Sequence, residues 1–115
     1  MSQITIYHNP RCSKSRETLK LIEDKGVTPH VVEYLKTPPT AEELTRILTL
    51  LGKNPAEILR KKEAAEAGID PTALSGAELV AAMVANPAVI ERPIVVAGAK
   101  AALGRPPENV LAILD

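Results

Sequence analysis

The first third of the chain alternates between apolar and polar residues in a way that predicts a strand, a helix and a second strand. Residues 3–7 (QITIY) alternate and are mostly β-branched or aromatic, which is typical of a short strand. Residues 13–25 carry Leu19 and Ile22 on one helical face, and residues 30–34 (HVVEY) predict a second strand. A strand, a helix and a strand in this order form a β-α-β unit, whose crossover favours parallel strands.

Two capping boxes predict helices in the middle of the chain. In each, a hydroxyl residue stands three positions before a glutamate, Thr40 before Glu43 and Ser75 before Glu78. The hydroxyl can accept a free backbone N–H of the first turn, and the glutamate can reach back to the cap. The first box is followed by apolar residues at helical spacing, and the second begins a helix that ends near residue 85.

A third helix is predicted between the two capping boxes. Asn54 suits the cap position and Pro55 the first helical position. Ile58 and Leu59 would form the apolar pair of this helix, and the region ends at Gly68.

The end of the chain predicts two strands and a last helix. Residues 94–97 (IVVA) predict a strand, Gly98 a turn, and residues 100–103 an antiparallel edge strand, before a helix that runs to Leu114. The whole order is β-α-β, three helices, then β-β-α. It predicts an α/β protein with a thioredoxin-like fold, in which a mixed four-stranded sheet is interrupted by helices.

Composition narrows the classes of protein to consider. The 115 residues hold 14 Lys and Arg against 14 Asp and Glu, and this balance argues against nucleic acid or an anionic membrane as a partner. No apolar run is long enough for a membrane span. The first residues lack the charged and apolar regions of a signal peptide. Together with a single cysteine, these features lead us to expect a cytoplasmic protein and a monomer.

The stretch HNPRCSKSR, residues 8–16, contains the candidate nucleophile. Cys12 falls between the first strand and the first helix, where the helix dipole and free N–H groups favour a thiolate. The alternative of a small buried hydrophobic residue stays open. Ser15 stands where a C-x-x-C motif needs its second cysteine, and Thr18 where a phosphatase loop needs arginine. His8 could be the base of a Cys-His pair or a local hydrogen-bonding group.

Metal binding has little support in the sequence. Cys12, His8 and His30 are the soft ligands of the chain, and they form no tight cluster. We therefore expect no metal.

Three arginines are candidates for binding an oxyanion. Arg60, Arg92 and Arg105 each lie near the predicted end of a helix or strand. A planar guanidinium suits a tetrahedral oxyanion because it can donate two parallel hydrogen bonds. Each could equally be a solvated surface arginine, and their spacing alone does not bring them together.

Four segments carry a resemblance to a known family. IYHNPRCSKSRETL, ILRK around Arg60, ERPIVV around Arg92 and GRPPE around Arg105 resemble the glutaredoxin-coupled arsenate reductases, and in particular their short, arsenate-reductase-like branch. The resemblance spans essentially the whole chain. It implies one thioredoxin-like domain over residues 1–115, with a helical insertion over residues 38–86.

The resemblance also implies roles for individual residues. Cys12 matches the catalytic nucleophile. Arg60, Arg92 and Arg105 match the arginines that bind the oxyanion substrate and stabilise the arsenic adducts.

Three further positions take their roles from the same resemblance. His8 matches a residue that assists near the nucleophile, and Ser15 matches one that hydrogen-bonds the thiolate. Pro93 matches the structural cis-proline of the fold, although sequence alone favours a trans bond.

The activity implied is the reduction of arsenate to arsenite in arsenic detoxification. The Cys12 thiolate would form an arsenic adduct that is resolved by glutathione, an external reductant, and by glutaredoxin, with no bound cofactor. A single cysteine fits this scheme, because the chain cannot supply a resolving thiol. Two alternatives are a general glutathione-dependent thiol-transfer enzyme and a non-catalytic partner-binding module of the same fold.

Overall fold

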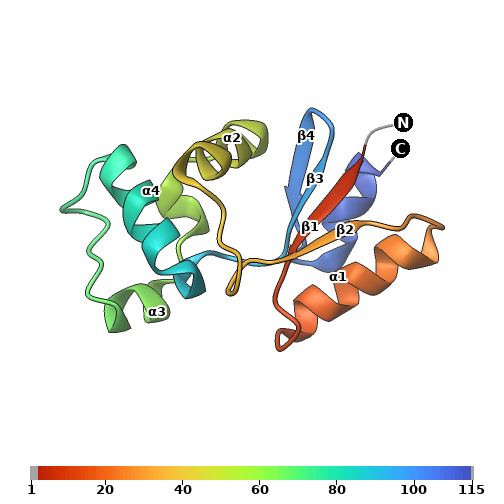
Figure 1. Ribbon diagram of the computed structural model, residues 1–115, viewed down its shortest axis with the longest axis horizontal. Coiled ribbons are helices and arrows are strands. Elements are labelled where there is room, and N and C mark those ends of the chain that lie inside the picture. The colour runs from red at the N-terminus through yellow and green to blue at the C-terminus, as the bar shows by residue number, and fades with distance from the viewer. Residues whose placement is uncertain (1–2, 115) are drawn as a thin grey trace. The chain divides into compact units, whose positions relative to one another are not determined.

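The alternating segments at the two ends of the chain form one four-stranded sheet (Figure 1). In this computed structural model, which describes residues 3–114, the strand order is β2-β1-β3-β4. Parallel pairing joins the first two strands, and the other two pairings are antiparallel. The strands are β1 (Ile4–His8), β2 (His30–Glu33), β3 (Ile94–Ala97) and β4 (Lys100–Leu103). The α/β class, the mixed four-stranded sheet and the order of its strands along the chain confirm the sequence-based prediction.

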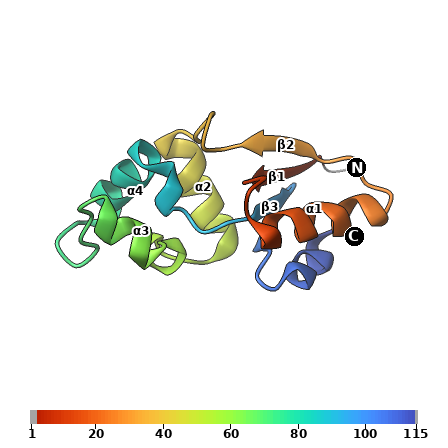
Figure 2. The same cartoon turned by 90° about the horizontal axis from the view of Figure 1, so that it is seen from below.

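One face of the sheet is covered by helix α1 (Ser13–Asp24) and by the 3-10 helix η3 (Pro107–Ile113), as Figure 2 shows. The core beneath them is aliphatic, as the composition predicts. Its centre consists of four side chains with no exposed surface, Ile6, Ile22, Val95 and Val110. Burying each aliphatic side chain of this size stabilises the fold by about 1.5–3 kcal/mol.

Helix α1 presents a mixed face to this core. Ser15, Thr18 and Ile22 are buried on it, at a spacing that returns to the same side of the helix. The hydroxyl of Thr18 donates to the carbonyl of Lys14, 2.8 Å away, and also lies 3.4 Å from the carbonyl oxygen of Gly104. Two polar residues are therefore accommodated inside because each has hydrogen-bond partners.

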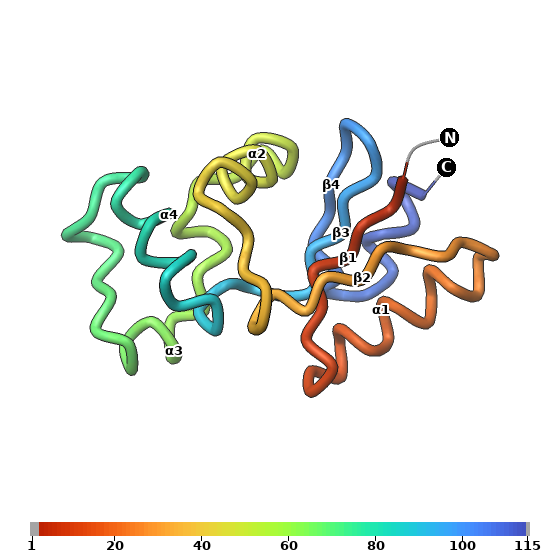
Figure 3. Tube along the Cα trace, viewed as in Figure 1, coloured from red at the N-terminus to blue at the C-terminus, as the bar shows by residue number. Residues whose placement is uncertain are grey.

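The middle of the chain forms a second compact unit, residues 38–91, distinct in its contacts from the unit that contains the sheet. Its trace can be followed in Figure 3. Helices α2 (Ala41–Leu51) and α4 (Gly76–Ala85) both begin with a complete capping box, at Thr40 and Ser75, which confirms the two predicted helix starts. Gly52 ends α2 with a φ of 67°, a conformation that glycine adopts without steric cost.

The prediction of one helix that begins at Asn54 and Pro55 in the region ending at Gly68 is wrong. A 3-10 turn, η1 (Pro55–Ile58), is followed by extended backbone at Leu59, and only then does α3 (Lys61–Glu66) begin. The cause is a tertiary pairing, because Leu59 forms an antiparallel bridge with Ile90, just after the short 3-10 helix η2 (Pro87–Val89). The last predicted helix also differs, since η3 is a 3-10 helix that ends at Ile113.

The expected single domain over residues 1–115 with an insertion over 38–86 stays a prediction. The second unit extends to residue 91. Within residues 3–114, none of the helices is both long enough and apolar enough to cross a membrane.

We predict that Gly104→Ala destabilises the protein. A Cβ at this buried position would lie 2.5 Å from the Thr18 hydroxyl oxygen and 2.6 Å from Pro93 Cγ, so α1 or the Pro93 segment would have to shift. Overpacking of this kind costs about 1–3 kcal/mol, which urea denaturation would measure. The matched control is Gly76→Ala, where an added Cβ meets nothing within 4 Å and should leave stability unchanged or slightly higher. Equal stability of the Gly104 variant and the wild type would contradict the prediction.

Candidate active site

The loop between β1 and α1 places Cys12 at the start of the helix. The backbone N–H of Cys12 donates to the carbonyl of Asn9 (3.0 Å), and the Asn9 side chain accepts from the N–H of Arg11 (3.0 Å). The carbonyl of Cys12 accepts the N–H of Arg16 (3.0 Å), the first hydrogen bond of α1. Cys12 is therefore the N-cap residue, with extended backbone, and its sulfur lies among the free N–H groups of the first turn.

Arg105 contacts the sulfur of Cys12 directly. Its Nη2 donates to Cys12 Sγ over 3.3 Å, and its Nε donates to the carbonyl oxygen of Arg92 over 2.7 Å. The guanidinium is thus anchored at one end on the backbone and presents its other end to the thiol. The Arg92 side chain also hydrogen-bonds the sulfur.

These contacts favour the thiolate form of Cys12. Burial raises the pKa of the Cys12 thiol, but this effect is outweighed by the hydrogen bonds from the Ser15 N–H, the Arg92 side chain and the Lys14 N–H, and by the charge of Arg105. The net result is a pKa below the ordinary value of a thiol. Cys12 is thus half-exposed and has a lowered pKa, which are properties of reactive cysteines and differ from those of a buried hydrophobic residue.

His8 and Ser15 form a buried pair below the loop. His8 Nδ1 and Ser15 Oγ lie 2.6 Å apart, and the same hydroxyl accepts the backbone N–H of Asn9 over 3.0 Å. Ser15 thus reaches the sulfur through its backbone N–H, while its hydroxyl holds His8 and the loop. Burial lowers the pKa of His8, opposed by the nearby Glu33 and assisted by Arg16, so the neutral imidazole is favoured.

Of the remaining predicted residues, Arg92 and Pro93 lie just before β3, Arg105 lies just after β4, and Arg60 lies in the second unit. The Arg92–Pro93 and Arg105–Pro106 peptide bonds are both cis. Arg60 belongs to the unit of residues 38–91, where its side chain pairs with Glu63 and Glu91. The convergence of all three arginines on one anion stays a prediction.

The roles of the predicted site residues stay predictions, and sequence reasoning missed some residues that contact them. It did not single out Asn9, whose carbonyl and side chain shape the nucleophile loop, nor Glu63 and Glu91. The only sequence signal for Asn9 was its place in a turn before Pro10. Within the described residues, no three His, Cys, Asp or Glu side chains are grouped to hold a metal ion.

Comparison with known proteins identifies the family of the chain. The model of the ArsC family matches residues 7–113. The chain belongs to the ArsC family.

Known proteins resemble the chain over nearly its full length. A protein from Escherichia coli (strain K12) named "Uncharacterized protein YfgD" is 54% identical, and the match covers 97% of each chain. A protein from Neisseria meningitidis named "Arsenate reductase" is 47% identical, over 99% of this chain and 100% of that one. The solved structure "Arsenate reductase from Vibrio cholerae" has a TM-score of 0.92 and 49% identity, over 98% of both chains.

We predict that Arg105→Ala makes the thiol of this ArsC-family protein harder to ionise. The rate of alkylation by iodoacetamide should titrate below the free-thiol midpoint of about 8.5 in the wild type, because the thiolate is the reacting form. Loss of the Arg105 charge and hydrogen bond should move the midpoint upward. Arg11→Ala is the control, because Arg11 is exposed in the same loop and does not contribute to the lowered pKa of Cys12. Identical midpoints for the Arg105 variant and the wild type would contradict this role.

We also predict that Ser15→Ala destabilises the fold by about 1–3 kcal/mol in urea denaturation. The substitution leaves the buried N–H of Asn9 and the ring of His8 without the shared hydroxyl, and an unsatisfied buried group costs about this much. Ser13→Ala, two residues earlier and exposed, should change stability little. A Ser15 variant as stable as the Ser13 variant would show that the pair contributes nothing.

Proposed function

We propose that this protein is an arsenate reductase, in which Cys12 attacks arsenate and external thiols complete the reduction to arsenite. The observation that carries the proposal is the 3.3 Å hydrogen bond from Arg105 to the Cys12 sulfur at a helix N-terminus. It is supported by relatives named arsenate reductase that match the chain end to end.

The proposed reaction begins with the thiolate of Cys12. The sulfur attacks arsenic(V), and one oxygen leaves as water, giving a thiolate–arsenic adduct. Arg92 and Arg105 lie beside the sulfur, so in this scheme their guanidinium groups bind the remaining arsenate oxygens and stabilise the charge that develops on them. Arg60 is proposed to bind the same oxyanion. His8 and Ser15 hold the loop that positions the sulfur.

External thiols supply the electrons in the later steps. Glutathione adds to arsenic with loss of a second water. The thiol of glutaredoxin then attacks the glutathione sulfur, forming a disulfide and leaving two electrons on arsenic, which becomes arsenic(III). Water finally displaces arsenite from Cys12. Three sulfurs take part and the chain has a single cysteine, so two of them must come from partners.

A coupled assay tests the proposal. Arsenate should drive NADPH oxidation in the presence of glutathione, glutathione reductase and glutaredoxin, and Cys12→Ser should reduce this to background. Arg105→Ala should lower kcat by about a hundredfold, the usual effect of removing a donor to a developing oxyanion. Arg11→Ala, in the exposed part of the loop, should retain activity.

Two outcomes would decide against arsenate reduction. Wild-type turnover no higher than that of Cys12→Ser would reject it. Release of glutathione from a glutathionylated peptide, undiminished in Arg105→Ala and without arsenate turnover, would favour the thiol-transfer alternative. Omitting glutaredoxin or glutathione in turn tests which external thiol each step requires.

A further inference from the structure

The guanidinium of Arg60 is held between two carboxylates. Its Nε donates to Glu63 Oε2 over 2.9 Å, and its Nη1 donates to Glu91 Oε1 over 2.7 Å. The three side chains are only 24–25% exposed, so these ion pairs are less screened by water than ordinary surface pairs. Burial lowers the pKa of Arg60, but the hydrogen bonds to Glu63 and Glu91 outweigh it and raise the pKa overall.

The backbone fixes this arrangement from both sides. Glu63 lies one turn into α3, whose N-cap residue is Arg60. Glu91 approaches from the other segment of the Leu59–Ile90 bridge, where Arg60 N–H donates to Val89 (2.7 Å) and Glu91 N–H donates to Ile58 (2.8 Å). Neither carboxylate depends on a flexible loop to reach the guanidinium.

Two carboxylates, those of Glu63 and Glu91, therefore hydrogen-bond the single guanidinium of Arg60. Of the three guanidinium nitrogens, Nη2 alone makes no hydrogen bond to a residue within 3–114, so it is the donor that an anion would meet without competition. An oxyanion can also accept two parallel hydrogen bonds, one from Nη1 and one from Nη2. For this, Nη1 would have to release its hydrogen bond to Glu91 or donate to Glu91 and to the oxyanion at the same time. Either way the anion approaches two negative charges.

We propose that Glu63 and Glu91 are positioning residues that compete with the oxyanion for Arg60, and thereby hold down the affinity of the site for anions that cannot form a bond to Cys12. This inference rests on the proposed function, in which Arg60 binds the oxyanion.

Such competition would make the site select arsenate over phosphate. Inorganic phosphate has nearly the same shape and charge as arsenate, so a strong arginine site would be occupied by phosphate. A weakened site binds both anions poorly, but arsenate gains a covalent bond to the Cys12 sulfur. Discrimination then comes from the adduct rather than from the encounter complex.

The experiment is a titration of the full-length protein with inorganic phosphate, followed through the NMR signals of the arginine Nε–H groups. Glu91→Gln keeps the side-chain shape and an acceptor oxygen but removes one negative charge. It should tighten phosphate binding by about fivefold, the effect of one unit charge about 4 Å away in water. Glu63→Gln should act in the same direction and provides a second variant if the first fails to fold.

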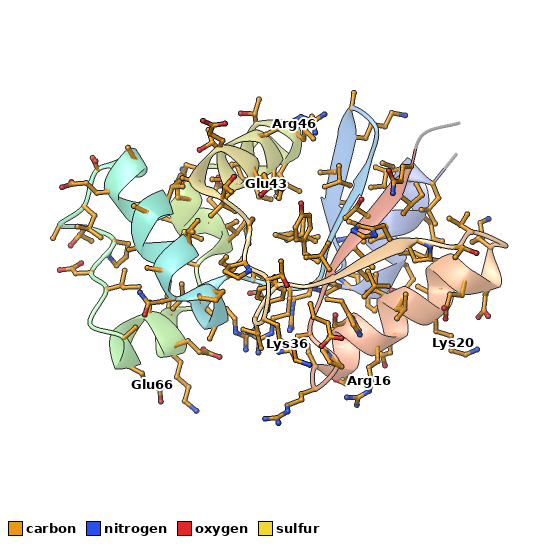
Figure 4. The ribbon with its side chains drawn as sticks, in the orientation of Figure 1. Arg16, Lys20, Lys36, Glu43, Arg46 and Glu66 are labelled. Atoms are coloured by element: carbon orange, nitrogen blue, oxygen red, sulfur yellow. The ribbon has the colours of Figure 1, made fainter. Side chains whose placement is uncertain are left out.

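The matched control is Glu66→Gln. It removes the same charge from α3, the helix that carries Glu63, but Glu66 is exposed and points away from the rest of the second unit (Figure 4). Its phosphate affinity should equal that of the wild type. In the coupled assay, phosphate should inhibit Glu91→Gln at lower concentrations than it inhibits the wild type or Glu66→Gln. A merely structural role for Glu91 would not produce a gain in affinity.

Arg60→Ala separates this inference from the proposed function. If the carboxylates act through Arg60, adding Glu91→Gln to Arg60→Ala should give no gain in phosphate affinity. Unchanged or weaker phosphate binding in both glutamine variants would overturn the inference while leaving arsenate reduction intact. Unchanged phosphate binding in Arg60→Ala would also overturn it, and would remove Arg60 from the proposed site without affecting the role of Cys12.

Discussion

The hydrogen bond from Arg105 to the Cys12 sulfur joins residues 93 positions apart, and most of the first unit is needed to make it. The loop after β1 sets the sulfur at the start of α1. Strand β4 ends just before Arg105, whose Nε donates to the carbonyl of Arg92, two residues before β3. Gly104 lies so close to Thr18 that a methyl group would not fit between them. The chemistry at the thiol therefore depends on close packing between two segments that meet only in the folded chain.

The loop around Cys12 is also held by hydrogen bonds to the buried side chain of Ser15. The hydroxyl of Ser15 serves as the common partner of His8 and of the Asn9 N–H, on the buried face of α1. Since a buried polar group is costly without partners, this network admits few alternative arrangements. Reactivity at the sulfur and rigidity of the loop thus come from the same short segment, in which backbone N–H groups face the thiol and side chains face the core.

The fold was predictable wherever local signals agreed with tertiary packing. The two capping boxes, at Thr40 and Ser75, predicted helix starts that the structure retains. Leu59 shows the opposite case, because a local pattern typical of a helix gave way to pairing with Ile90, 31 residues away. The candidate site also contains residues that local sequence signals indicate and residues that only long-range pairing brings into place. Cys12 was found from its helix N-terminus, whereas the glutamates beside Arg60 were not, since their role arises only from that long-range pairing.

Ser15 also limits how the family pattern can change within this chain. A cysteine at this position would complete a C-x-x-C sequence, yet the side chain of residue 15 has no exposed surface and points toward His8 and Asn9. A second thiol there would be a weak acceptor for both partners and would lie out of reach of solvent. In the proposed reaction, an internal resolving thiol at residue 15 would therefore require the packing of α1 against His8 and Asn9 to change.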